Sequence, residues 1–167
     1  MENTSKNLEG LPIAFREIEN QDISFVFNSW MTSYRQSKNL VSVAQPFYFN
    51  GQHKLIEKIL SKAKGLLLVD KDNPSQIYSY LVYEFIDGIF VMHYAYTKQT
   101  FRKLGLLRRM LEKAGFSSSG LYTHESKVAR YVGDKLNLFY NPYLLFDFPP
   151  ANPEKPKEIP QDVLEQL

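Results

Sequence analysis

The chain has 167 residues, a length that suits one domain with one sizeable core. Hydrophobic residues make up 44% and charged residues 23%, ordinary values for a globular protein, and a net charge of +2 is too small to indicate a nucleic-acid-binding protein. The absence of cysteine excludes disulfides, thiolate metal sites and cysteine nucleophiles. With no visible signal peptide and no apolar run of membrane-spanning length, we expect a cytoplasmic protein.

The first half of the chain predicts a strand, two helices and a further strand. Apolar residues recur at helical spacing from Ile23 to Tyr34, a stripe that we assign to the core, and Asp22 offers an N-cap oxygen before it. Residues 41–49 read as irregular because a proline interrupts them. The expected elements are a strand over 11–18, the helix that begins at Ile23, a second helix over 52–63 and a short buried strand over 65–70.

The second half opens with a hairpin and continues with alternating helices and strands. Asp87-Gly88 is a strong hairpin signal between two long strands rich in tyrosine, phenylalanine, valine and isoleucine, and Gly115 ends the helix that follows. This order predicts a mixed sheet, antiparallel in its first half and with a βαβ crossover in its second. The expected elements are strands over 76–86 and 89–96, a helix over 101–114, a strand over 121–125, a helix over 126–136 and a last strand over 143–148.

Composition divides the chain into three segments. Residues 1–10 are polar and are expected to be a flexible N-terminus, and residues 11–148 form the domain. Residues 149–167 are expected to be a proline-rich tail, because five of the nine prolines lie between Pro149 and Pro160.

The stretch from Tyr94 to Leu111 has the features of an anion site. A long strand ends, a short loop follows, and an amphipathic helix begins; the first turn of a helix leaves backbone N–H groups unpaired and favours negative charge. Gly105 would let the backbone approach a phosphate closely. The alternative interpretation is a packing glycine beside a solvated basic face. Positive charge is added by Arg102, Lys103, Arg108 and Arg109.

The segment from Arg102 to Leu107, Arg-Lys-Leu-Gly-Leu-Leu, resembles the pyrophosphate-binding motif Arg/Gln-x-x-Gly-x-Gly/Ala of the GNAT superfamily of N-acetyltransferases. The segment from Ser126 to Leu138 looks like the second signature of that family, a helix started by Asn or Ser with an alanine packed inside it. The resemblance covers residues 11–148. It implies the acyl-CoA N-acyltransferase fold, an α/β (mixed α+β) architecture with a central mixed, twisted sheet of about six or seven strands flanked by about four helices.

The resemblance also implies where acetyl-CoA would bind as co-substrate. Amides around residues 102–107 would cradle the pyrophosphate, and the backbone of residues 94–97 would pair with the pantetheine arm much as an added strand does. Ser126 would touch the same arm. The expected cofactor-binding residues are Tyr94, Tyr96, Thr97, Arg102, Lys103, Leu104, Gly105, Leu106, Leu107 and Ser126.

Two positions depart from the family pattern. Leu107 stands where the family has Gly or Ala, so a phosphate would approach less closely there. Gly133 stands where the family often has its proton-donating tyrosine. Either Tyr131 or Tyr140 would then substitute, or the acid is absent.

Acyl transfer to an amine needs a base, and the first candidates are Glu84 and His93. A two-residue turn would place Glu84 opposite Val91 and Val82 opposite His93, so that Glu84 and His93 become diagonal neighbours roughly 7–8 Å apart on one sheet face. The alternative is that His93 is a satisfied structural histidine. A slip of one residue in the turn would also separate the pair.

His124, beside Glu125 on the next strand, is the second choice of base. No His or carboxylate cluster has metal-ligand spacing, and we expect no metal site. The candidate catalytic residues are Glu84, His93, His124 and Tyr131.

These observations predict a transferase, an acyl-CoA-dependent N-acetyltransferase that moves an acetyl group from acetyl-CoA to an amine. The acceptor is left open among a small molecule, a protein amine and a modified nucleobase, and an oligomer is compatible with the sequence. The alternative is a non-catalytic protein on the same fold that docks a partner through its proline-rich tail, as Gly133 and Leu107 would favour.

Overall fold

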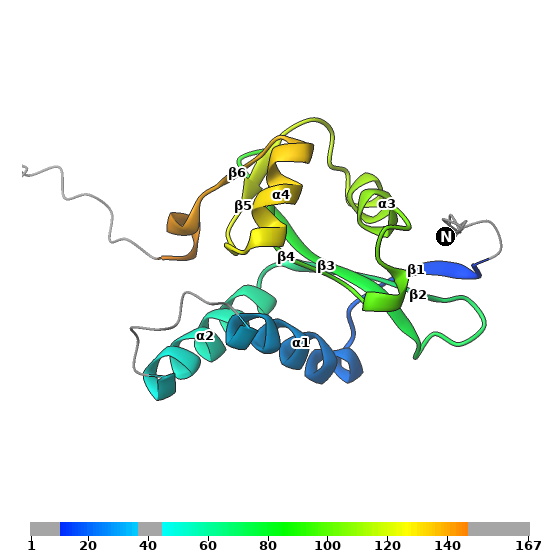
Figure 1. Ribbon diagram of the computed structural model, residues 1–167, viewed down its shortest axis with the longest axis horizontal. Coiled ribbons are helices and arrows are strands. Elements are labelled where there is room, and N and C mark those ends of the chain that lie inside the picture. The colour runs from blue at the N-terminus through cyan, green and yellow to red at the C-terminus, as the bar shows by residue number, and fades with distance from the viewer. Residues whose placement is uncertain (1–10, 37–44, 147–167) are drawn as a thin grey trace, which may run out of the picture.

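The computed structural model describes residues 11–36 and 45–146, so the expected N-terminal segment 1–10 and tail 149–167 lie outside the described residues. Three of its elements are short 3-10 helices, labelled η. In chain order the elements are β1 (Ile13–Glu17), η1 (Asn20–Asp22), α1 (Ile23–Gln36), α2 (Gln45–Leu60), β2 (Lys64–Asp70), β3 (Ile77–Ile86), β4 (Ile89–Thr97), η3 (Gln99–Phe101), α3 (Leu106–Lys113), β5 (Gly120–Tyr122), α4 (Lys127–Leu136), β6 (Leu138–Tyr140) and η4 (Pro142–Leu145) (Figure 1).

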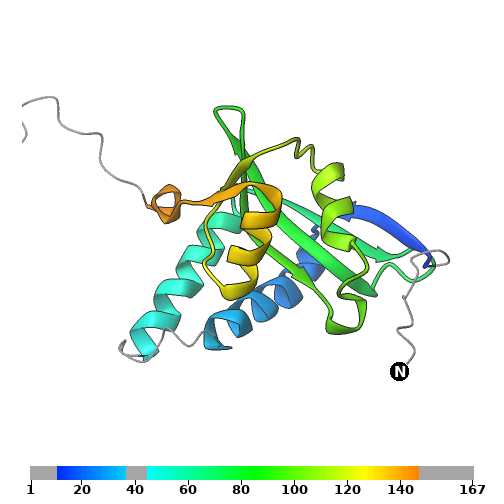
Figure 2. The same cartoon turned by 45° about the horizontal axis from the view of Figure 1, so that its top comes forward.

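The described strands form one six-stranded sheet in the order β1-β2-β3-β4-β5-β6. Strands β1 to β4 are antiparallel neighbours, whereas β5 runs parallel to β4 and β6 parallel to β5. Helices α1 and α2 cover one face, and α3 and α4 lie on the other (Figures 1 and 2). The predicted mixed sheet of about six or seven strands flanked by about four helices is confirmed.

Each sheet face has its own hydrophobic core. The stripe predicted on α1 is buried on one side of the sheet, where Val26 and Trp30 have no exposed surface and pack with Tyr80 and Val82 of β3. On the other side, the α3 residues Leu106, Met110 and Leu111 pack with Leu66, Leu68 and Leu81. Burial of this kind contributes roughly 25 cal/mol per Å² of apolar surface and fixes both helix pairs against the strands.

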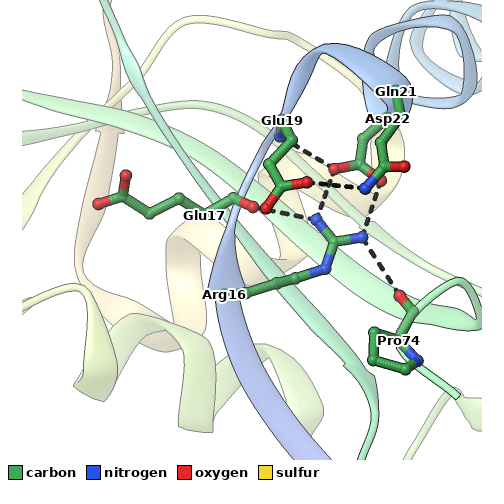
Figure 3. Close-up of polar contacts among 6 residues, drawn as sticks. All are labelled: Arg16, Glu17, Glu19, Gln21, Asp22 and Pro74. Carbon is green, nitrogen blue, oxygen red and sulfur yellow. Dashed lines mark hydrogen bonds and ion pairs between the residues drawn. The ribbon is translucent and has the colours of Figure 1, made fainter.

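A partly buried ion pair ties β1 to the start of α1 (Figure 3). Nη2 of Arg16 donates to Oδ1 of Asp22 at 2.8 Å and to the carbonyl oxygen of Pro74 at 3.2 Å, while Oδ2 of Asp22 accepts from the amide of Glu19 at 2.9 Å. Asp22 therefore ends η1, and the prediction that it is the N-cap of the next helix is wrong. Its hydrogen bond from Arg16 lowers the pKa of the Asp22 carboxyl, despite the opposing effect of burial.

Two helices begin at other residues than predicted. Helix α2 starts at Gln45, earlier than expected, because Pro46 lies in its first turn, where no N–H donor is needed. Helix α3 starts at Leu106 rather than at residue 101, because Lys103 (φ 67°) and Gly105 (φ 72°) adopt left-handed conformations that an α-helix excludes.

The last strand also differs from the prediction. The chain leaves α4 through Asn137, which has a left-handed conformation at the C-cap, and enters β6 directly. Residues 143–145, which begin the expected final strand, belong instead to η4, and the side chain of Asn141 accepts a hydrogen bond from the amide of Tyr143. Within the described ranges, no helix combines the length and apolarity that crossing a membrane requires.

Candidate functional site

The β3–β4 hairpin positions the first pair of candidate residues. Asp87 (φ 50°) and Gly88 (φ 79°) form the expected turn, in which both central residues have positive φ, and Glu84 faces Val91 as predicted. The register then shifts by a β-bulge, and Val82 faces Tyr94 instead of His93. The predicted Val82–His93 pairing is therefore wrong, because the bulge inserts one extra residue into β4.

The extra residue of the bulge is His93, because Met92 pairs with Tyr83 and Tyr94 with Val82. Without the bulge, Tyr94 would lie on the same sheet face as Phe90 and Met92. With it, Tyr94 joins the core under α1, while Met92 stays in the core under α3. The bulge thus turns the second half of β4 over relative to the first half.

Glu84 and His93 are in direct contact. Nε2 of His93 lies 2.8 Å from Oε1 of Glu84, and Nδ1 lies 3.0 Å from Oγ1 of Thr123. Nζ of Lys62 is 3.7 Å from the same Glu84 oxygen. Burial of the imidazole lowers the pKa of His93 against the opposing effect of Glu84. Both ring nitrogens are engaged and the residue is 1% exposed, so His93 presents no free nitrogen to a substrate.

Strands β4 and β5 separate just beyond this point. They pair only at Val91–Leu121 and Met92–Tyr122, followed by a hydrogen bond from the amide of Thr123 to the carbonyl of Met92 at 3.1 Å. Strand β4 continues to Thr97, bonded on its other side to β3. In the described part of the chain, the β5-facing edge of residues 94–97 has no strand partner. This is the edge on which the sequence places the pantetheine arm.

The loop that enters α3 carries a run of free backbone amides. No amide of residues 103–108 donates a hydrogen bond to any described group; the first that does is Arg109, to the carbonyl of Gly105 at 3.3 Å. A Cβ built on Gly105 would meet no atom within 4 Å, so the space in front of this loop is open. The side chains of Leu104 and Leu106 turn into the core, which leaves the backbone on the outside. Free amides at an open helix start suit an anion.

The cations around this loop are exposed. Nε of Arg102 donates to the carbonyl oxygen of Thr97 at 3.1 Å, which holds the side chain beside the end of β4. Arg108 is paired with Glu112 one helical turn further on. Lys103 and Arg109 form no ion pair with any carboxylate in residues 11–36 or 45–146. The motif region therefore combines free amides with uncompensated positive charge.

His124, the second candidate base, follows β5 and is buried between aromatic rings. Its ring makes edge contacts with Tyr34 and Tyr94, at centroid distances of 4.7 and 5.1 Å. Ser33 Oγ donates to the carbonyl of Trp30 at 2.7 Å and lies 3.4 Å from Nε2 of His124. In the tautomer that donates from Nε2 of His124 to Ser33 Oγ, the single Ser33 proton stays on that carbonyl.

In this tautomer, Nδ1 of His124 is an unprotonated nitrogen with an available lone pair. It is buried and has no hydrogen-bond partner in the described part of the chain. Burial lowers the pKa of His124 to about 4, although nearby Glu125 raises it slightly. At neutral pH this residue can therefore accept a proton or a hydrogen bond, which His93 cannot do without losing a partner.

Helix α4 places the remaining candidates. Ser126 is its N-cap, and its Oγ accepts from the amide of Ala129 at 3.0 Å, so the predicted helix start is confirmed. Tyr131 is 65% exposed on the outer side of α4, with Nζ of Lys135 5.9 Å from its ring centroid. Tyr140 is 45% exposed and tilts against Tyr122. The structure does not bring Tyr131 together with Glu84, His93 or His124 through any described contact.

Sequence reasoning missed Thr123 and Ser33, which fix the two histidines. Thr123 directly precedes His124, and this adjacency was the available signal for it. Ser33 lies on α1 between the core residues Trp30 and Tyr34, a position that periodicity assigns to packing, so no sequence signal singles it out.

Comparisons with known proteins bear on the fold. No family model matches the chain, and no curated protein matches it by sequence. Among solved structures, a possible acetyltransferase from Clostridium difficile is 14% identical with a TM-score of 0.50, covering 84% of this chain and 99% of that one. The apo form of YjaB from Escherichia coli is 16% identical with the same score, covering 74% of this chain and 78% of that one.

A provisionally assigned acetyl transferase from Pyrococcus furiosus is 14% identical with a TM-score of 0.50, and the match covers 86% of this chain and 99% of that chain. At such identities the similarity concerns the fold. The mixed sheet flanked by helices agrees with it. The chain has the acyl-CoA N-acyltransferase fold of the GNAT type.

Proposed function

We propose that this protein is an acyl-CoA-dependent N-acyltransferase that transfers an acyl group, acetyl in the simplest case, to an amine. The observation that carries the proposal is the run of free amides over residues 103–108 in front of the open space at Gly105. A diphosphate is the ligand chemistry that such a helix start accepts. The fold and the unpaired edge of β4 support the same reading.

The residues present fit an acyl-CoA. The amides of residues 103–108 would bind the pyrophosphate, with Lys103 and Arg109 adding charge. The free edge of residues 94–97 would bind the amide groups of the pantetheine arm, as an added strand would. Leu107 is half-buried against the core under α3, so its side chain leaves this backbone uncovered. The bound acyl-CoA supplies an activated thioester.

We assign the role of proton acceptor to His124. A neutral imidazole with an unpaired Nδ1 can take the proton that an amine loses when it attacks a carbonyl, and access to this buried nitrogen requires a movement of the surrounding rings. Burial keeps this ring unprotonated near neutral pH. The side chain lies just past the point where β4 and β5 separate. Glu84 and His93 remain the competing pair, but the nitrogens of His93 are both occupied.

Calorimetric titration with acetyl-CoA tests the binding step. We expect binding that weakens as salt rises, because the site is cationic. Release of free thiol on adding pooled amines then tests transfer. His124→Gln should lower kcat by about 100-fold, within the range for general acid–base catalysis, while acetyl-CoA binding persists. If no acetyl-CoA or CoA binding is detected, the proposal fails.

A non-catalytic role on the same fold is the second candidate. The observation in its favour is that α4 offers no tyrosine hydroxyl at the family position, because Gly133 has no side chain and Tyr131 faces outward. CoA binding without thiol release from any amine would favour this candidate. The amine in the pool that gives rise to free thiol identifies the class of acceptor: a small molecule, a protein amine or a modified nucleobase.

A further inference from the structure

His93 and Thr123 contact each other where β4 and β5 separate. We propose that Thr123 is a positioning residue, and that the hydrogen-bonded chain Glu84–His93–Thr123 fixes the segment that carries His124. The proposal rests on the function proposed above, in which His124 accepts a proton. Thr123 itself touches no reacting group; it acts through the orientation of the next residue.

The chemistry of the three groups sets the direction of both hydrogen bonds. The Glu84 carboxylate only accepts, so Nε2 of His93 donates to it across 2.8 Å. Nδ1 of His93 is then unprotonated and accepts from the hydroxyl of Thr123 across 3.0 Å. His93 is 1% and Thr123 is 3% exposed, so water competes little for these hydrogen bonds.

The register of the hairpin makes this chain geometrically available. Glu84 lies two residues from Val82, which packs under α1 and α2, so Glu84 points to that face of the sheet. His93 lies two residues from Val91, the partner of Glu84, so it points to the same face and contacts Glu84, and the bulge brings Tyr94 to that face as well. A regular strand would place consecutive residues on opposite faces.

The segment after β5 has few other anchors at this position. Its last described backbone bond to β4 is the Thr123 amide to the Met92 carbonyl at 3.1 Å. The Thr123 hydroxyl adds a second anchor on the same residue. The position of the His124 ring between Tyr34 and Tyr94 therefore depends on Thr123, and a shift of about 1 Å in a reacting group can lower a rate by about 100-fold.

The test compares Thr123→Val, which keeps the shape but removes the hydroxyl, with Thr123→Ser, which keeps the hydroxyl. The first readout is ¹⁵N NMR of the histidine rings in the full chain without ligand. In the wild type we expect His93 and His124 both to carry hydrogen on Nε2. Thr123→Val should shift the His124 ring signals, although His124 does not contact that hydroxyl, and Thr123→Ser should restore them.

The second readout is the kinetic split in the thiol-release assay. Thr123→Val should lower kcat about tenfold or more with the KM for acetyl-CoA within about twofold of the wild type, and Thr123→Ser should recover most of kcat. If Thr123→Val lowers the melting temperature but leaves the His124 signals and kcat unchanged, Thr123 is only structural and the proposal is overturned. Wild-type protein without thiol release would refute the proposed function instead, and the NMR comparison would still decide whether Thr123 positions His124.

Discussion

The ring of Tyr122 fills the space beside Gly133. A Cβ at Gly133 would lie 2.9 Å from Cε1 of Tyr122 and 3.0 Å from the carbonyl oxygen of Leu138. The Tyr122 hydroxyl donates to Oε2 of Glu125 at 3.3 Å, and burial raises the pKa of this tyrosine. The departure from the family pattern at Gly133 is therefore matched by packing, since no larger residue fits between α4, β5 and β6.

Gly133→Ala should destabilise the protein by about 1–3 kcal/mol, the usual cost of overpacking, because backbone and a ring already occupy the new methyl position. Gly51→Ala is the matched control: Gly51 lies in α2, and a Cβ there meets nothing within 4 Å. That variant should gain about 0.5–1 kcal/mol from helix propensity. Urea unfolding measures the free energy of unfolding of both variants. If Gly133→Ala is as stable as Gly51→Ala, the packing argument is contradicted.

Gly105→Ala should weaken acetyl-CoA binding about tenfold or more, because the methyl group enters the open space beside the loop that carries the free amides. Gly88→Ala is its control, since Gly88 also has positive φ and open surroundings but lies in the β3–β4 turn. Both variants carry a similar backbone strain of about 1–2 kcal/mol. Calorimetry should find normal affinity for Gly88→Ala; a parallel loss in both would locate the effect in stability rather than in the site.

Arg16→Gln should lower the free energy of unfolding by about 3 kcal/mol, because it leaves the Asp22 carboxylate buried without its cation (Figure 3). Arg108→Gln breaks an ion pair of the same chemical type, but the Arg108 and Glu112 side chains are 81% and 62% exposed. Exposed pairs of this kind contribute less than about 0.5 kcal/mol. Urea unfolding at low salt separates the two, and a small effect of Arg16→Gln would show that Asp22 finds water or another partner.

Much of the fold follows from local patterns in the sequence. Apolar spacing predicts α1, and Asp87-Gly88 predicts the hairpin, because each pattern reflects forces acting within one element. The start of α3 was placed too early because Lys103 has a left-handed conformation that its residue type does not signal. Pro46 was read as a helix breaker, although in a first turn it is tolerated.

The site was predictable only in part. The resemblance located the motif around Gly105, and the hairpin brought Glu84 and His93 near each other. The bulge at His93 could not be predicted, because it depends on how β4 packs between two cores and on where β5 ends. For the same reason, the engaged state of His93 and the free Nδ1 of His124 became visible only with the tertiary contacts.

The buried, neutral ring of His124 should make the stability of the fold sensitive to acid. Burial lowers the pKa of His124 to about 4 in the folded chain, against about 6.5 in the unfolded chain. Between pH 6.5 and pH 4 the unfolded state binds a proton at His124 that the folded state does not bind. The stabilisation is therefore fully present above pH 6.5 and is lost as the pH falls toward 4. From pH 7.5 to pH 5, this one group lowers the free energy of unfolding by on the order of 2 kcal/mol. His93, whose pKa burial also lowers, acts in the same direction.

The free energy of unfolding of His124→Gln, measured in urea at the two pH values, should therefore depend less on pH than that of the wild type. His53→Gln serves as the control for the loss of a histidine side chain, since His53 is 51% exposed on α2. Asp22, with its pKa lowered by Arg16, loses its contribution only at more acid pH, below the window measured. A His124→Gln variant as acid-sensitive as the wild type would mean that the ring is not desolvated, and its role as a neutral proton acceptor would lose its physical basis.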